Sequence, residues 1–161
     1  MKKIFASART VKEFLPPNKT FTLVAGSFDL LHVGHIHLFE FASTLEDLLV
    51  VAALSDESVR RYKPAGRPVI NESQRAKMLA SLAVVDMVYI SDVNPNGRET
   101  LEFLRPNSVV FGGDVSAQNV GRWTSNISVS SPHTRVHILP RYDAEEVSTS
   151  HIIKRIRAMD G

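Results

Sequence analysis

The stretch that most constrains the fold is residues 24–42, VAGSFDLLHVGHIHLFEFA, where an apolar run meets a turn and then a helical pattern. The apolar run that ends at Ala25 contains no glycine or proline, as expected for a buried strand, and Gly26 follows it directly. Apolar residues recur at helical spacing after Gly34. The sequence therefore predicts a strand, a turn and a helix in immediate succession.

The predicted turn carries two imidazoles, His32 and His35, on either side of Gly34. Glycine lets a ligand approach the backbone closely, and a helix start offers unpaired N–H groups worth about 0.3–1 kcal/mol to an anion. Two histidines at this spacing are also compatible with zinc ligands on one helical face, or with ordinary polar residues of a turn. The preceding strand, the GSFD turn and the intervening glycine favour phosphate as the ligand.

Length and composition limit the remaining choices. A chain of 161 residues is long enough for a single domain without metal or disulfide support, and the absence of cysteine excludes thiolate zinc sites. Charged residues interrupt the N-terminus before a signal-peptide core, and no apolar run reaches membrane-spanning length, so a cytoplasmic protein is expected. A net charge of +2, with basic residues scattered or in short clusters, argues against nucleic-acid binding.

The rest of the chain alternates apolar strands with helical patterns. The run LLVVAAL at 48–54 is continuously apolar, which is typical of parallel strands covered on both faces. This alternation predicts a three-layer, Rossmann-like α/β domain with a parallel five-stranded sheet. Residues 1–18 are expected to form a lead-in helix, and the polar residues 115–134 are compatible with a helix or a loop. Strands are expected at 20–25, 48–54, 84–90, 108–111 and 135–139; helices at 35–44, 71–83, 99–104 and from 147 onward.

Four polar segments follow strands and should meet at one edge of such a sheet, where ligands bind. They are the histidine turn, the cation-rich loop around Lys63, the turn Gly112-Gly113-Asp114 and the helix start Ser148-Thr149-Ser150. Each has a simpler explanation as well: a solvated connector with a surface lysine, a strand-end turn, or plain helix N-caps. Arg75 is similarly compatible with the exposed surface of a helix.

Residues 26–29 and the pattern His32-Val33-Gly34-His35 resemble the signature of the HxGH nucleotidyltransferase superfamily, which includes cytidylyltransferases and several adenylyltransferases. Segments further along resemble the half of bifunctional heptose-phosphate enzymes that adenylylates heptose 1-phosphate. They are Ser55-Asp56, Lys63, Gly66–Val69, Gln74-Arg75, Leu79, Val85-Asp86, Gly112–Asp114 and Ser148–Ser150 with Ile152-Ile153.

Two other members of the superfamily are also similar. GSFDLLHVGH and Leu139-Pro140-Arg141 resemble glycerol-3-phosphate cytidylyltransferase, although the link from Arg141 to Ser148 is longer than in cytidylyltransferases. Pantetheine-phosphate adenylyltransferase has a similar length and a GSFD start. Its family, however, carries an arginine-glycine-x-arginine segment where this chain has Gly112-Gly113-Asp114.

The resemblance implies transfer of a nucleoside monophosphate from ATP, or alternatively CTP, to a phosphorylated sugar or polyol such as heptose 1-phosphate, with Mg²⁺ carried by the triphosphate. It implies a homodimer and no protein-only metal site. Asp29 is expected to hold Mg²⁺ through water or to orient a histidine. The implied catalytic residues are His32, His35 and Lys63; the acceptor-binding residues Lys63 and Arg75; the nucleotide-binding residues Gly26, Ser27, Phe28, Asp29, Gly34, Gly112, Asp114, Arg141, Ser148, Thr149 and Ser150.

Two rival classes predict different sequence features. A non-catalytic nucleotide sensor would need no acceptor loop, so the segment around Lys63 argues against it. An oxidoreductase with a dinucleotide site would carry GxGxxG after the first strand, a spacing that Gly26 and Gly34 do not match.

Overall fold

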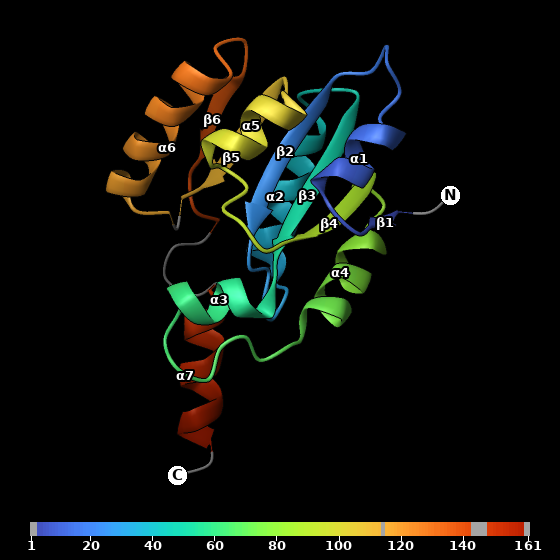
Figure 1. The fold of residues 1–161 in the computed structure, drawn as a ribbon. Helices are drawn as coiled ribbons and strands as arrows, with labels where there is room; N and C mark the ends of the chain where they lie inside the picture. Colours follow the sequence, from blue (N-terminus) through green and yellow to red (C-terminus); the bar gives the residue numbers. More distant parts are fainter. Residues whose placement is uncertain (1–2, 114, 143–147, 160–161) are drawn as a thin grey trace.

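A six-stranded parallel sheet forms the centre of the computed structural model, which describes residues 3–113, 115–142 and 148–159 (Figure 1). The strand order is β1-β4-β3-β2-β5-β6, and every pair of neighbours is parallel. The strands are β1 (Ile4–Phe5), β2 (Phe21–Gly26), β3 (Leu48–Leu54), β4 (Met87–Ser91), β5 (Ser108–Gly112) and β6 (Arg135–Leu139).

Seven helices accompany the sheet in the described part of the chain. They are α1 (Ala8–Phe14), α2 (Val33–Ser43), α3 (Asp56–Tyr62), α4 (Glu72–Ala80), α5 (Arg98–Leu104), α6 (Ala117–Ser130) and α7 (Thr149–Met159). None of these helices combines the length and the apolar character needed to cross a membrane. The expected helix start at Val147 lies outside the described residues.

The prediction of a three-layer Rossmann-like α/β fold is confirmed, but the predicted number of strands is wrong. The sixth strand is β1, which adds to the outer edge of β4 through the pairs Ile4↔Val88 and Phe5↔Tyr89. A strand of two residues is too short to show a period, so the lead-in segment indicated only the helix that follows it, α1. The polar segment 115–134 contains α6, whose first turn is capped by Ser116.

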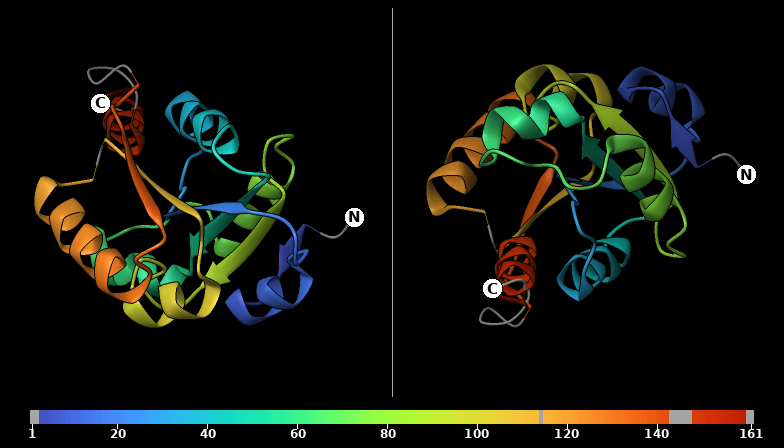
Figure 2. Two further views of the ribbon diagram at one scale, coloured as in Figure 1. Left: turned by 90° about the horizontal axis from the view of Figure 1, so that it is seen from above. Right: turned by 90° about the horizontal axis from the view of Figure 1, so that it is seen from below.

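Helices cover both faces of the sheet, as the views from above and from below show (Figure 2). One face packs against α1, α5 and α6 through side chains such as Val11, Leu101 and Ile127. The other face packs against α2 and α4 through side chains such as Phe39 and Leu79. Burial on both faces explains why the sequence of the central strand β3 is apolar throughout rather than alternating, whereas the edge strand β6 contains exposed residues.

The winding of the chain reverses at β2, which has β3 on one side and β5 on the other. Ligands of open parallel sheets bind beyond the carboxyl ends of the strands at such a reversal. The helices α3 and α7 lie beyond this end of the sheet (Figure 1). The fold therefore places the histidine turn, the start of α7 and the segment after α3 at one edge.

Candidate active site

The turn after β2 is shaped by the aromatic ring of Phe28. A side chain at Gly26 would place its Cβ 2.9 Å from Phe28 Cζ, so this position requires glycine. Phe28 has a positive φ of 48° and is buried, with its ring centroid 5.1 Å from that of Phe39 and 5.5 Å from that of His35. Gly26 and Phe28 are both predicted from the sequence to bind nucleotide. Neither residue lines the cavity described below, although Ser27 between them does.

The two histidines lie against each other at the start of α2. Their rings stack with centroids 3.8 Å apart, and the His32 backbone N–H donates a 3.3 Å hydrogen bond to His35 Nδ1. Burial, and secondly the proximity of His32, lower the pKa of His35 from 6.5 to about 3, against a partly opposing effect of Asp29. His35 is therefore neutral at ordinary pH, and with Nδ1 accepting, its Nε2–H is the available donor.

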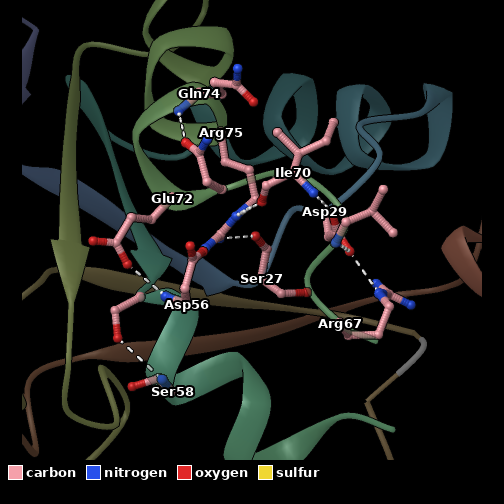
Figure 3. Close-up of polar contacts among 12 residues, drawn as sticks. Ser27, Asp29, Asp56, Ser58, Arg67, Ile70, Glu72, Gln74 and Arg75 are labelled. Atoms are coloured by element: carbon pink, nitrogen blue, oxygen red, sulfur yellow. Dashed lines mark hydrogen bonds and ion pairs between the residues drawn. The ribbon is translucent and has the colours of Figure 1, made fainter. Parts of the chain in front are cut away.

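Asp29 is completely buried and holds the loop that follows α3 (Figure 3). Its Oδ2 accepts hydrogen bonds from Arg67 Nε at 2.6 Å and from the Val69 amide at 2.9 Å, and its Oδ1 accepts one from the Ile70 amide at 2.9 Å. Burial raises the pKa of Asp29, but these hydrogen bonds and the Arg67 charge outweigh it and leave the pKa below its usual range. Both carboxylate oxygens of Asp29, which was predicted to bind nucleotide and to hold Mg²⁺ through water or orient a histidine, thus accept hydrogen bonds from the loop 67–70.

Arg75 is likewise an internal residue rather than an acceptor ligand or a surface arginine (Figure 3). Its guanidinium donates to the carbonyl oxygens of Ile70 and Ser27 and to Asp56 Oδ1, the last at 2.8 Å. All three nitrogens are thus used within the protein. The structure thus places the predicted acceptor ligand Arg75 in a buried network, which the helical pattern could not reveal because it does not show that this long side chain turns inward.

Lys63 is the C-cap of α3 and is exposed, which fits both a contact with a charged substrate and a solvated surface lysine. The start of α3 is fixed, since the Ser55 side chain caps it and the Asp56 amide donates to Glu72 Oε2 at 2.6 Å. Gly66, three residues after Lys63, has a φ of +84°, and no atom lies within 4 Å of the point that a Cβ would occupy there. The segment is held at its start by the capped end of α3 and at its finish by the hydrogen bonds from residues 67–70 to Asp29. Lys63 lies between these two fixed points.

The ends of β5 and β6 approach each other closely. A Cβ at Gly113 would lie 2.5 Å from the Arg141 backbone nitrogen, so the glycine accommodates the protein backbone rather than a base. Arg141 is exposed beside it, and the Tyr142 ring lies 5.1 Å from the ring of His37. Asp114, the third residue of the predicted nucleotide-binding turn, lies outside the described residues.

The start of α7 combines helix capping with an anchor to the histidine turn. Ser148 Oγ accepts a 3.0 Å hydrogen bond from the His151 amide, which is an N-cap bond. Thr149 Oγ1 donates a 2.8 Å hydrogen bond to the backbone oxygen of Asp29. The simpler explanation of this segment as a cap is therefore correct for Ser148, and the same residues also face the cavity.

A cavity of about 440 Å³ lies between these segments. Ten of the predicted residues line it, and no carboxylate does so among the residues that the structure describes. Arg67, His37 and Tyr142 also line it but were not predicted as site residues. The cation-rich loop around Lys63 could have indicated Arg67 as a site residue, whereas His37 resembles an ordinary polar residue of a helix. The predicted residues in the lining are Ser27, His32, Gly34, His35, Lys63, Gly112, Arg141, Ser148, Thr149 and Ser150.

The described residues contain no group of three or more histidine and carboxylate side chains that would suit a metal ion. His32 and His35 come within stacking distance, but the nearby carboxylate, Asp29, already accepts three hydrogen bonds. The zinc interpretation of the histidine pair therefore finds no further ligands in this part of the chain.

Comparison with known sequences identifies one family and a group of relatives. A family model described as cytidylyltransferase-like matches residues 23–155. The bifunctional protein HldE of Geotalea uraniireducens (strain Rf4) is 41% identical over 157 residues, which cover 98% of this chain and 31% of that protein. HldE of Syntrophotalea carbinolica is 40% identical over 138 residues, 86% of this chain and 27% of the relative. This chain thus spans less than a third of these relatives.

Solved structures show the same fold at low sequence identity. The lipopolysaccharide core biosynthesis protein from Thermoplasma volcanium GSS1 superposes with a TM-score of 0.67 at 23% identity, covering 78% of this chain and 100% of that one. Pantothenate synthetase from Thermus thermophilus gives a TM-score of 0.70 at 14% identity, covering 98% and 71% of the two chains. Both likenesses support the fold alone.

Proposed function

This chain belongs to the cytidylyltransferase-like family, and we propose that it transfers a nucleoside monophosphate from ATP to a phosphorylated sugar such as heptose 1-phosphate, releasing pyrophosphate. The observation that carries the proposal is the cavity in which the His32–His35 pair, Lys63 and the start of α7 meet. It offers neutral and cationic hydrogen-bond donors and, among the described residues, no carboxylate. Such a lining suits several phosphate groups in one place.

Nucleotidyl transfer needs little more than positioning and neutralisation of charge. The acceptor phosphate already carries the attacking oxygen, so neither a covalent intermediate nor a strong base is required. His35 is neutral at ordinary pH and its Nδ1 accepts from the His32 amide, so its Nε2–H would donate to a phosphate oxygen. The α2 amides behind Gly34 add the favourable end of the helix dipole.

The lining residues divide between the substrates in this proposal. Gly112, Arg141 and the residues Ser148–Ser150 would receive the nucleotide. Lys63, which follows α3 and also lines the cavity, would contribute its charge to the acceptor phosphate or to the leaving pyrophosphate. The two histidines would contact the α-phosphate that is attacked.

Magnesium would reach this site with the triphosphate. Mg²⁺ binds mainly through phosphate oxygens and water and needs few protein ligands, which fits a lining rich in donors. When bound, it would neutralise charge on the phosphates that leave as pyrophosphate. The protein residues named above would then orient the phosphates around it.

The most specific part of the proposal is the identity of the nucleotide and of the acceptor. The likeness to heptose-phosphate adenylyltransferases over residues 55–86 supports ATP and a sugar 1-phosphate. The segment Leu139-Pro140-Arg141, which lines the cavity, keeps CTP with glycerol 3-phosphate as the alternative. A pyrophosphate-release assay that crosses ATP and CTP with sugar 1-phosphates and polyol phosphates tests both, with and without Mg²⁺. Turnover only with CTP and a polyol phosphate would favour the alternative substrates over ATP and a sugar 1-phosphate. If no pair of nucleotide and acceptor is turned over and calorimetry detects no nucleotide binding, the proposal of nucleotidyl transfer is overturned.

We also propose that the protein is a homodimer. The apolar side chains of Ile156 and Met159 on α7 are 51% and 82% exposed, and no residue of this helix is buried in the single chain. Sedimentation equilibrium of the wild type and of a Met159→Lys variant would test this. A monomeric wild type would overturn the dimer without affecting the proposed reaction.

A further inference from the structure

We propose that Arg67 binds a substrate phosphate group and that Asp29 acts as the positioning residue that holds Arg67 for this purpose. The inference rests on the proposed function and adds a substrate ligand to it. The sequence pattern pointed to Arg75 as the acceptor arginine, but its three guanidinium nitrogens are all used within the protein.

Arg67 is tied to Asp29 through one nitrogen and leaves the others available. Its Nε lies 2.6 Å from Asp29 Oδ2, and the side chain is only 9% exposed (Figure 3). Neither terminal Nη group donates a hydrogen bond to any residue that the structure describes. Neither Nη group is among the buried side-chain atoms that lack a partner, so both remain accessible from the spaces that the side chain lines. A bound anion would accept hydrogen bonds from them.

The surroundings of Arg67 indicate what that anion is. The side chain lines the 440 Å³ cavity together with Lys63 and His35, and it also lines a smaller neighbouring hollow of about 360 Å³ beside Arg60. No carboxylate lines either space among the described residues. Two parallel N–H groups of a guanidinium match two oxygens of one phosphate, a geometry that a lysine cannot reproduce.

Asp29 is suited to positioning because it joins three segments of the site. Its side chain holds Arg67 and the amides of Val69 and Ile70, and its backbone oxygen accepts from Thr149 on α7. Asp29 itself belongs to the histidine turn. The direction of the Arg67 guanidinium is therefore fixed relative to the histidines and to α7 at once. The Arg67 guanidinium would therefore already be oriented before the substrate binds.

The decisive variant is Arg67→Gln. Glutamine has its Nε2 at the same position along the side chain as arginine Nε, so the hydrogen bond to Asp29 can persist while both Nη groups and the charge are removed. Arg98→Gln is the matched control, because Arg98 is exposed on α5, pairs with Glu102 and lines neither space. Thermal unfolding of both variants first establishes that they fold.

Calorimetric titration with inorganic pyrophosphate, ATP and heptose 1-phosphate then separates the possibilities. We expect Arg67→Gln to weaken at least one of these ligands by tenfold or more, with Arg98→Gln unchanged. Weakened pyrophosphate and ATP would place Arg67 on the triphosphate, and weakened heptose 1-phosphate would place it on the acceptor. Affinities within twofold of wild type for all three would overturn the inference.

A second variant tests the positioning role. Asp29→Asn keeps the Arg67 charge but places an amide where two backbone N–H groups and Arg67 require an acceptor. We expect weaker binding of the same ligand that Arg67→Gln affects, measured well below the melting temperature. Lowered thermal stability with unchanged affinity would make Asp29 purely structural. If wild type binds pyrophosphate but transfers no nucleotide to any acceptor, the proposed function fails while the Arg67 inference is still decided by the pyrophosphate titration.

Discussion

Thr149 Oγ1 donates a 2.8 Å hydrogen bond to the backbone carbonyl of Asp29, and so joins the first turn of α7 to the histidine turn 120 residues earlier in the chain. This bond is the point where the last helix is attached to the substrate end of the sheet. Among the described residues it is the only hydrogen bond from α7 to another element, and no residue of the helix is buried. The position of Ser148 and Ser150 at the cavity therefore depends on it.

Thr149→Val tests this attachment. Valine has the shape of threonine but no donor, so the bond to Asp29 is lost, at a cost of about 0.5–1.5 kcal/mol. We expect a fall in kcat/KM that exceeds the small loss of stability, because the start of α7 loses its position at the cavity. Thr44→Val is the control, since Thr44 makes a similar 2.7 Å bond to the Phe41 carbonyl within its own helix. Equal effects of the two variants on kcat/KM would contradict this interpretation.

His35→Asn separates the two nitrogens of His35. The asparagine Oδ1 takes the place of Nδ1, which accepts from the His32 amide, while the Nε2 donor is removed. We expect a folded protein whose kcat is lower by roughly 10²–10³, the usual cost of one donor to the transition state. His133→Asn, at an exposed position, serves as the control. Steady-state pyrophosphate release provides the measurement, and activity within threefold of wild type would exclude His35 from the reaction.

His35 also predicts how stability depends on pH. Its pKa is lowered from 6.5 to about 3 in the folded state, so between these values the unfolded chain binds more protons. The free energy of unfolding should therefore fall as the pH drops below 6.5, by at most about 1.4 kcal/mol per pH unit from this residue. Urea unfolding of wild type and His35→Asn from pH 8 to pH 4 isolates the effect. The advantage of wild type over the variant should shrink on acidification; a constant difference would refute the lowered pKa.

The sequence predicted the centre of the sheet well because its central strands are buried on both faces. Continuous apolar runs such as residues 48–54 indicate a strand without any knowledge of tertiary contacts. The missed strand, Ile4–Phe5, is stabilised by pairing with β4, a contact between residues more than 80 positions apart. The edge at which the polar segments meet followed from the topology of parallel sheets alone.

The roles of individual side chains were harder to predict than their location. Arg75 and Arg67 are both arginines near the same loop, yet one is buried in a network and the other lines the cavity. Asp29 belongs to the motif, but its partners come from residues 67–70, which no local pattern connects to it. Local sequence indicates which residues can bind phosphate, and the tertiary contacts determine which of them are free to do so.

Lys63→Ala should affect substrate binding and leave the fold intact. Lys63 is exposed and its side chain forms no hydrogen bond or ion pair with another described residue, so its removal costs little stability. We expect a KM for one phosphorylated substrate at least fivefold higher than in wild type, with the melting temperature unchanged. Lys77→Ala on α4 is the control, because that lysine is exposed but does not line the cavity. Unchanged kinetics would show that Lys63 is a solvated surface residue.

Arg75→Met should do the opposite, and destabilise the protein more than it alters substrate affinity. The change leaves Asp56, Ile70 and Ser27 without their donor, and breaking a buried ion pair from one side typically costs about 3–5 kcal/mol. Methionine fills much of the volume of the arginine side chain. The loss of stability therefore measures the lost hydrogen bonds and ion pair rather than an empty space left in the core. Lys77→Met on the same helix measures the effect of an equivalent exposed change. Urea unfolding gives the stability, and kinetics at low temperature, where the variant remains folded, give the KM values. A variant with wild-type stability and a raised KM for the acceptor would return Arg75 to the substrate-binding role that its sequence position suggested.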